Sequence, residues 1–198
     1  MRRGLQLLPL LLMLSGCLAT SSYDYRREPD PRQLEYVIGP ADQLSIQVWR
    51  NADVSRDVTV RPDGTITLPL IGDIRAEGLT PTQLRDEIAK RLEDFVRGEG
   101  LLVTVSVTAV NSYSFTVSGS VERPGVYSSP RYVTVLEAIQ LAGGPNRFAS
   151  PQATKLFRRT GGRGSKVRTI PIDYSAVVDG RRPEANLVLL SGDQLYVP

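Results

Sequence analysis

The sequence predicts an α+β fold made of two small domains. Residues 36–110 and 111–198 each contain the same succession of elements, in which strands surround a turn with proline and glycine and one helix precedes a further strand. Hydrophobic residues make up 41% of the chain, which is ordinary for a globular protein. At 198 residues the chain holds one large domain or two small ones, and the repeated succession favours two.

The first 16 residues have the pattern of a signal peptide. Arg2 and Arg3 precede an apolar run from Leu5 to Leu14. A run of about ten residues is too short to cross a bilayer, which takes roughly 20 apolar residues. The pattern therefore predicts export from a bacterial cytoplasm and removal of residues 1–16.

Cys17 follows directly and is the only cysteine in the chain. A single thiol cannot form a disulfide within the chain, so this residue needs another role. Residues 17–35 are polar and charged and contain Pro29 and Pro31, a composition typical of an extended linker. We expect the folded domains to be carried on a tether.

The first domain begins with an alternating strand pattern. Leu44, Ile46 and Val48 share one face, which should be buried, and Trp49 at the end of the strand is expected to pack as well. Two short β runs then flank Arg61-Pro62-Asp63-Gly64, where proline presets φ and glycine takes the left-handed position. This pattern predicts a hairpin around the turn.

The clearest helix covers residues 80–96. Thr80 suits the N-cap, Pro81 the first helical position and Gln83 the third, which completes a capping box. Residues 101–110 then alternate as a strand. The buried stripe of the helix is predicted to consist of Leu84, Ile88, Leu92, Phe95 and Val96.

The second domain opens with two strands around a Pro-Gly turn at 122–125, and a helix over 134–142 follows with a T-x-x-E capping box. Two further strands flank a glycine-rich loop at 161–164, and a last strand closes the chain. Asp42-Gln43-Leu44 in the first domain and Asp193-Gln194-Leu195 in the second repeat the same three residues. We interpret this repeat as a strand-entry pattern shared by the two domains.

The composition excludes several classes of site. The chain has no histidine, which removes Ser-His-Asp and Cys-His catalysis and histidine-based metal sites. Without Arg2 and Arg3, 22 of the 24 basic residues remain against 21 acidic residues. This nearly even balance is not typical of a nucleic-acid-binding protein. Turn roles are predicted for the aspartates close to glycine or proline, which are Asp42, Asp63, Asp73 and Asp193. We therefore predict no enzyme activity, no cofactor and no metal site.

The residues around the single cysteine resemble a known processing motif. Leu14-Ser15-Gly16-Cys17 is similar to the lipobox of bacterial lipoproteins. This resemblance implies cleavage before Cys17 by signal peptidase II and acylation of its thiol. Leu18, in place of the aspartate associated with inner-membrane retention, favours an anchor in the outer membrane. Several acyl chains on one residue would hold the protein firmly, since each buried CH₂ contributes about 0.8 kcal/mol.

Six segments together resemble the Wza-like outer-membrane polysaccharide export proteins. In order they are "YVIGPADQLSIQVW", "VRPDGTITLPLIGDIRAEGLTPTQLRDEIAKRL", "VTVSV", "FTVSGSVERPGVY", "TVLEAIQLAGG" and "LLSGDQLYVP". The resemblance implies that 36–110 is a polysaccharide export domain and 111–198 a soluble-ligand-binding β-grasp (SLBB) domain. One departure is Ala41, where the family's usual Gly-Pro-Gly-Asp has its second glycine.

The resemblance also implies a function. Proteins of this family are lipoproteins that assemble as homo-oligomeric rings in the periplasm, around a lumen through which capsular polysaccharide or exopolysaccharide leaves the cell. They work with an inner-membrane polysaccharide copolymerase. Because the sequence shows no second apolar segment, we expect a separate outer-membrane β-barrel to complete the path.

Candidate contact residues for a neighbouring subunit or the polymer are Arg61, Pro62, Asp63 and Gly64, with a simple turn as the equal alternative. A different interpretation of the whole chain is a monomeric envelope lipoprotein that binds a glycan or peptidoglycan. An enzyme that trims the polymer is disfavoured by the missing histidine.

Overall fold

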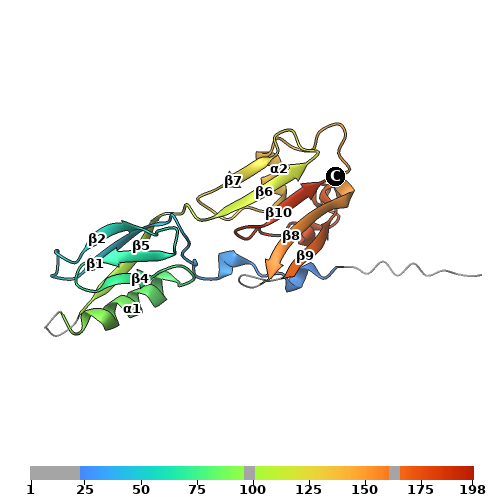
Figure 1. The fold of residues 1–198 in the computed structure, drawn as a ribbon. Coiled ribbons are helices and arrows are strands. Elements are labelled where there is room, and N and C mark those ends of the chain that lie inside the picture. The colour runs from blue at the N-terminus through green and yellow to red at the C-terminus, as the bar shows by residue number, and fades with distance from the viewer. Residues whose placement is uncertain (1–22, 96–100, 161–165) are drawn as a thin grey trace, which may run out of the picture.

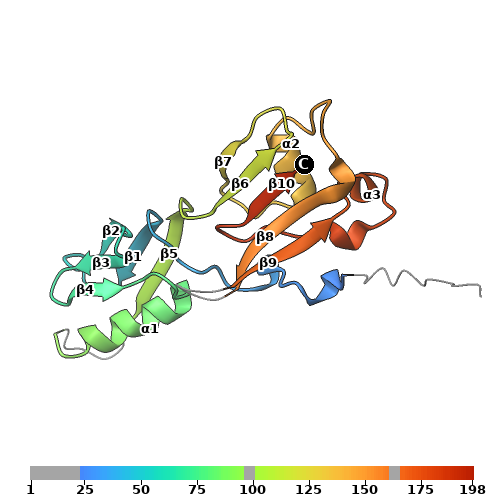
Figure 2. The same cartoon turned by 45° about the vertical axis from the view of Figure 1, so that its right-hand side comes forward.

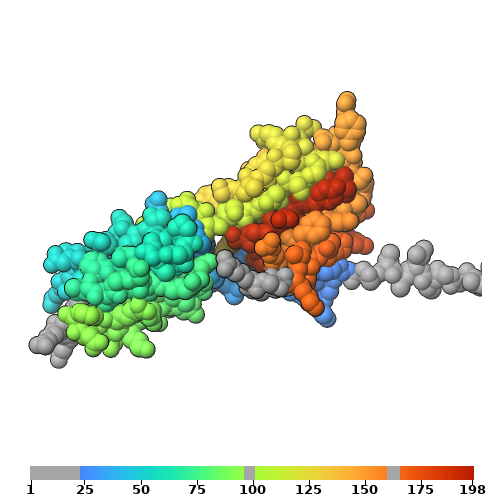
Figure 3. All heavy atoms as spheres, viewed as in Figure 1, coloured from blue at the N-terminus to red at the C-terminus, as the bar shows by residue number. Residues whose placement is uncertain are grey.

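The computed structural model describes residues 23–95, 101–160 and 166–198. Figure 1 shows two bodies joined end to end, and Figure 3 shows the same two lobes as packed atoms. Each lobe has its own buried core, one running from Ile38 to Val103 and the other from Tyr113 to Val197 with Tyr25 added. The predicted α+β fold of two small domains is confirmed.

The first domain is built on a three-stranded antiparallel sheet in the order β2-β1-β5. The central strand buries Leu44, Ile46 and Val48 on one face, as the alternation predicted. Trp49, which was expected to pack, is instead 63% exposed, so that prediction is wrong. The strands are β1 (Gln43–Val48), β2 (Arg56–Thr59) and β5 (Val103–Ala109).

The turn at 61–64 has the predicted geometry, but the strands on either side do not pair with each other. The Gly64 N–H donates to the Arg61 carbonyl at 2.9 Å, and the Arg61 N–H donates to the Thr65 carbonyl at 2.9 Å. Strand β2 pairs with β1, whereas β3 (Thr65–Leu68) pairs with β4 (Gly72–Arg75) in a second sheet. Ile66 lies opposite Ile74 in this second sheet, and both side chains are buried. This cross-strand apolar pair favours pairing of β3 with β4 over pairing with β2. The hairpin prediction is therefore wrong beyond the turn.

Helix α1 (Pro81–Leu92) forms with both bonds of the predicted capping box. The Gln83 N–H donates to Thr80 Oγ1 at 3.2 Å, and the Thr80 N–H donates to Gln83 Oε1 at 3.0 Å. Leu84, Ile88 and Leu92 are buried as predicted. Phe95 is 56% exposed because the helix ends three residues earlier, so its place in the predicted stripe is wrong. Val96 lies outside the described residues.

The second domain is a five-stranded mixed sheet in the order β7-β6-β10-β8-β9, covered by helices on one side (Figure 2). The closing strand runs parallel to β6 and antiparallel to β8, so it joins two antiparallel hairpins into one sheet. Thr134 and Glu137 form the predicted capping box of α2. The elements are β6 (Ser114–Gly119), β7 (Gly125–Ser128), α2 (Val135–Leu141), β8 (Thr154–Thr160), β9 (Lys166–Ile172), α3 (Tyr174–Val178) and β10 (Gln194–Val197). The glycine-rich loop at 161–164 lies outside the described residues.

Residues 23–35, before the first domain, do not run as an extended tether. This segment packs on the second domain and forms two 3-10 turns, Tyr25–Arg27 and Pro31–Gln33. Tyr25 is only 7% exposed, and its hydroxyl donates to the Pro171 carbonyl at 2.7 Å. The tether prediction for residues 17–35 is therefore wrong from residue 23 onward. Cys17 and the signal peptide at 1–16 lie outside the described residues.

Candidate functional site

The predicted contact turn carries a surface network of charges. The Arg61 guanidinium lies between two carboxylates, with Nη2 at 2.7 Å from Asp63 Oδ2 and 3.1 Å from Asp73 Oδ2. Its Nη1 donates to Thr67 Oγ1 at 3.1 Å, and the Thr65 N–H donates to Asp63 Oδ1 at 3.0 Å. The three charged side chains are between 42% and 56% exposed. The structure thus brings Arg61 and Asp63 together with Asp73, which the sequence did not place near them.

One guanidinium serves two carboxylates in this network, and hydroxyl and amide donors complete the bonding. Hydrogen bonds from Arg61 and Thr65 hold the pKa of Asp63 well below its usual range, and bonds from Thr67 and Arg61 lower the pKa of Asp73. Gly64 has φ of +81°, and a Cβ there would come 2.7 Å from Glu77 Cβ. Both features stabilise the turn itself, so any contact with polymer or a neighbouring subunit would be an addition to this structural role.

We expect Arg61→Gln to raise the pKa of Asp63 toward its ordinary value. Because the folded pKa is depressed, the contribution of Asp63 to stability is present above the pKa of the unfolded chain and is lost as pH falls through the folded value. In this variant the loss begins at the same pH, set by the unfolded carboxyl, but it is smaller and is complete at a higher pH. In the wild type the contribution decreases in high salt, because the pair is exposed. A carboxyl-detected NMR titration measures the shift. An Asp63 pKa that does not move would mean that Thr65 alone holds the carboxylate.

A second aspartate is completely buried where the two domains join. Asp42 Oδ1 accepts hydrogen bonds from the Asn111 and Ser112 N–H groups, both at 2.8 Å. Its Oδ2 accepts from the Gly39 N–H at 2.8 Å, the Tyr36 hydroxyl at 2.6 Å and Ser112 Oγ at 3.0 Å. Asn111 and Ser112 precede the first strand of the second domain. Asp42 therefore holds the start of the second domain against the first.

Asp193 occupies the equivalent place in the second domain. The Leu190 N–H donates to Asp193 Oδ2 at 2.8 Å, just as the Gly39 N–H donates to Asp42. The residue before each aspartate is left-handed, with φ of +72° at Ala41 and +81° at Gly192. The shared strand-entry pattern and the turn roles of both aspartates are therefore confirmed. Sequence reasoning missed that both carboxylates are buried and also hold distant segments, and its only sign was the repeated Asp-Gln-Leu.

We expect Ala41→Gly to stabilise the protein. An L-residue in the left-handed region is strained by about 1–2 kcal/mol, while glycine costs more entropy on folding, which leaves a net gain of about 0.5–1 kcal/mol. Ala41 is exposed, so little packing is lost. Urea denaturation measures the change. An unchanged or lower midpoint would show that the turn accommodates alanine without strain.

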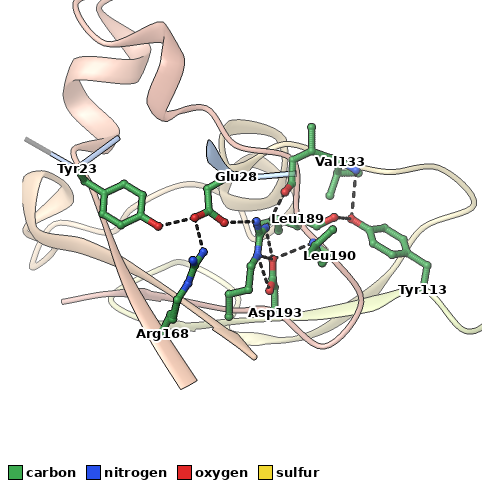
Figure 4. A network of polar contacts seen from close by, with 10 residues as sticks. Tyr23, Glu28, Tyr113, Val133, Arg168, Leu189, Leu190 and Asp193 are labelled. Atoms are coloured by element: carbon green, nitrogen blue, oxygen red, sulfur yellow. Dashed lines mark hydrogen bonds and ion pairs between the residues drawn. The ribbon is translucent and has the colours of Figure 1, made fainter. Parts of the chain in front are cut away.

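The second buried carboxylate belongs to an ionic network around Arg158 (Figure 4). Arg158 Nη2 lies 2.6 Å from Asp193 Oδ2 and donates to the Val188 carbonyl at 2.8 Å. Arg158 Nη1 lies 3.0 Å from Glu28 Oε2, and Glu28 also pairs with Arg168. The side chains of Arg158, Asp193 and Glu28 are each 2% exposed. Two cations and two carboxylates thus balance at this point.

This network fixes the N-terminal segment on the second domain. Burial disfavours the charge of Arg158, but the carboxylates of Asp193 and Glu28 outweigh it and raise the pKa of the guanidinium. Burial and the hydrogen bond to Glu28 raise the pKa of Tyr23 to about 12. The sequence had only predicted Glu28 as a solvated residue of a tether. Its buried partner stands 130 positions further along the chain, beyond the reach of a local pattern.

Comparison with known proteins matches both domains to described families. Residues 30–108 match the family described as polysaccharide biosynthesis/export protein, and residues 114–171 match the SLBB domain. The chain belongs to the Wza-like family of polysaccharide export proteins. This family consists of export proteins, which are not enzymes, and that agrees with the sequence prediction.

Several curated proteins resemble this member of the family. Exopolysaccharide production protein ExoF of Rhizobium meliloti is 33% identical over 151 residues, covering 71% of this chain and 34% of the relative. EPS I polysaccharide export outer membrane protein EpsA of Ralstonia nicotianae is 30% identical over 186 residues, covering 82% and 47%. Polysialic acid transport protein KpsD of Escherichia coli is 23% identical over 169 residues, covering 85% and 28%. The chain thus spans between 28% and 47% of the length of these relatives.

Two kinds of feature are absent from the described residues. Within 23–95, 101–160 and 166–198, no helix has the length and apolar character needed to cross a membrane. The same ranges contain no cluster of three or more cysteine, histidine, aspartate or glutamate side chains placed to hold a metal ion.

Proposed function

We propose that this chain is a component of an envelope conduit that exports a capsular polysaccharide or an exopolysaccharide. The observation that carries the proposal is the presence of both family domains in one chain, connected through the buried carboxylate of Asp42. Relatives are named for exopolysaccharide production and for polysaccharide export at the outer membrane, which supports an envelope location. The exported polymer and the copolymerase of the inner membrane are its proposed partners.

Copies of the chain are proposed to form a ring in the periplasm, anchored by lipid at Cys17. The lipobox-like sequence before Cys17 supports the anchor. Six peptide units separate Cys17 from Tyr23, which limits the distance between them to roughly 22 Å even if fully extended. The Tyr23 hydroxyl donates to Glu28, whose buried carboxylate pairs with Arg158 and Arg168 of the second domain. A lipid on Cys17 would therefore hold the second domain next to the membrane and leave the first domain facing the periplasm.

Deletion of the gene, followed by complementation, tests the export proposal. We expect the deletion strain to lose secreted polysaccharide while polymer synthesis in the cell continues, and complementation to restore secretion. Unchanged secretion would contradict an export role.

Native mass spectrometry of the detergent-solubilised protein tests the ring, which predicts one discrete high-order oligomer. A monomeric mass would contradict the ring and favour a binding lipoprotein.

We expect Cys17→Ser to release folded protein from the membrane fraction. The variant cannot be acylated at this position, and the anchor is proposed to depend on that acylation. Fractionation of cells and detection of the protein in the soluble periplasm measure the change. Cys17→Ser protein that remains bound to outer membranes in a strain without the export partners would contradict a lipid anchor at Cys17.

A further inference from the structure

Trp49 is the single tryptophan of the chain and lies in an unusual position. It follows strand β1. Its backbone N–H donates to the Leu102 carbonyl at 2.9 Å, and its side chain is 63% exposed. Leu102 beside it is 61% exposed. Single exposed apolar side chains are ordinary on a protein surface, whereas adjacent ones that line a groove make a candidate contact site. The fold itself does not use this indole.

The backbone that presents Trp49 is firmly held. The Asn51 side-chain amide donates to the Trp49 carbonyl at 2.9 Å. The Val48 N–H donates to Ser55 Oγ at 2.8 Å, and this hydroxyl donates to the Asn51 carbonyl at 3.0 Å. Arg50, between them, has φ of +60°, a strained value for arginine. Such a turn offers the indole to a ligand without a large ordering cost.

A groove of about 540 Å³ lies beside the indole, within the usual size of ligand sites. Its polar lining includes Gln47, Arg50, Asn51 and Thr104. Within the described part of the chain, the guanidinium of Arg50 forms no ion pair or side-chain hydrogen bond. The amide nitrogens of Gln47 and Asn51 act as donors, while their amide oxygens accept no hydrogen bond among the described residues. Unused donors and acceptors therefore surround a flat apolar ring.

We propose that this Trp49 groove is a carbohydrate subsite that binds one or two sugar residues of the exported polymer. A pyranose ring has an apolar face of C–H groups and a rim of hydroxyls, which matches an indole surrounded by donors and acceptors. Arg50 adds a cation for a hydroxyl or carboxylate of the sugar. A protein partner would be favoured by a wider apolar surface than one indole and one leucine. The inference rests on the proposed export function, because that function supplies the polymer.

The single tryptophan makes a direct test feasible. Oligosaccharides prepared by partial hydrolysis of the polysaccharide that the strain secretes are titrated into the whole purified protein while the emission of Trp49 is recorded. We expect a saturable shift of the emission to shorter wavelength and reduced quenching by acrylamide. Calorimetry with the same oligosaccharides should show at least a tenfold weaker association for Trp49→Ala. Phe95→Ala, which removes another exposed aromatic residue outside the groove, should bind like the wild type.

Three results would overturn the inference. One is a titration without saturable change, and another is Trp49→Ala protein that binds as tightly as the wild type. The third is a smaller oligomer for Trp49→Ala in native mass spectrometry, since the groove would then be a contact between copies. The first result, wild-type protein without saturable binding, would reject the subsite and leave the export proposal intact. Unchanged secretion in the deletion strain would instead reject the export proposal.

Discussion

Arg158→Met is expected to destabilise the second domain by about 3–5 kcal/mol. The substitution keeps most of the side-chain volume but leaves the carboxylates of Asp193 and Glu28 buried without their cation, and an uncompensated buried charge costs that much. Hydrogen exchange resolved by peptide measures the effect, because it reports opening of each domain separately. Peptides from β8 and β10 should exchange through a lower free energy of opening, while those from β1 should stay unchanged.

Arg168→Met is the matched control for this variant. Arg168 also pairs with Glu28, but its side chain is 47% exposed, so water replaces the lost partner. A loss of less than about 1 kcal/mol is expected for such a pair. If Arg158→Met cost no more than Arg168→Met, the buried network would not hold the domain together. The N-terminal segment would then be docked by Tyr25 and its apolar neighbours instead.

The local elements of this protein could be predicted from its sequence because their causes are local. Both capping boxes form as expected, since the residues that make each box lie within three positions of one another. The alternation in β1 identified its buried face for the same reason. Chain contacts that join distant positions were not predictable in this way. Nothing near Glu28 shows that Arg158 will meet it, and nothing near Arg61 shows that β3 will pair with β4 instead of β2.

The residues of the candidate site were likewise predictable where their causes are local and not where they are distant. The turn at 61–64 was predicted from proline, aspartate and glycine, whose backbone preferences act within four residues. Its closing partner Asp73 comes from β4, beyond the strand that follows the turn, and was not predicted as part of the same network. Trp49 was predicted to pack but is exposed. A strand pattern predicts which face a residue lies on, but it does not show whether anything covers that face. An exposed indole is visible only in the folded structure.

Asp42→Ala is expected to cost about 3 kcal/mol or more and to loosen the connection between the domains. The substitution removes the acceptor of the N–H groups of Gly39, Asn111 and Ser112, whose bonds to the buried Asp42 carboxylate are partly buried, and each unsatisfied buried group costs about 1–3 kcal/mol unless water reaches it. Asp42→Asn should fall between wild type and alanine, because its amide retains one acceptor oxygen. The amides of Asn111 and Ser112 should then exchange faster than those in the centre of β6.

Asp63→Ala is the matched control, because Asp63 also lies in a proline-containing turn of the same domain. Its carboxylate is 56% exposed, so solvent can replace its bonds and stability should barely change. Both aspartates lie in turns, so a difference in stability between Asp42→Ala and Asp63→Ala reports the effect of burial alone. Asp42→Ala should also reduce secreted polysaccharide if export depends on a fixed arrangement of the two domains. A loss of stability no larger than that of Asp63→Ala would mean that water enters the junction and that other contacts hold the two domains.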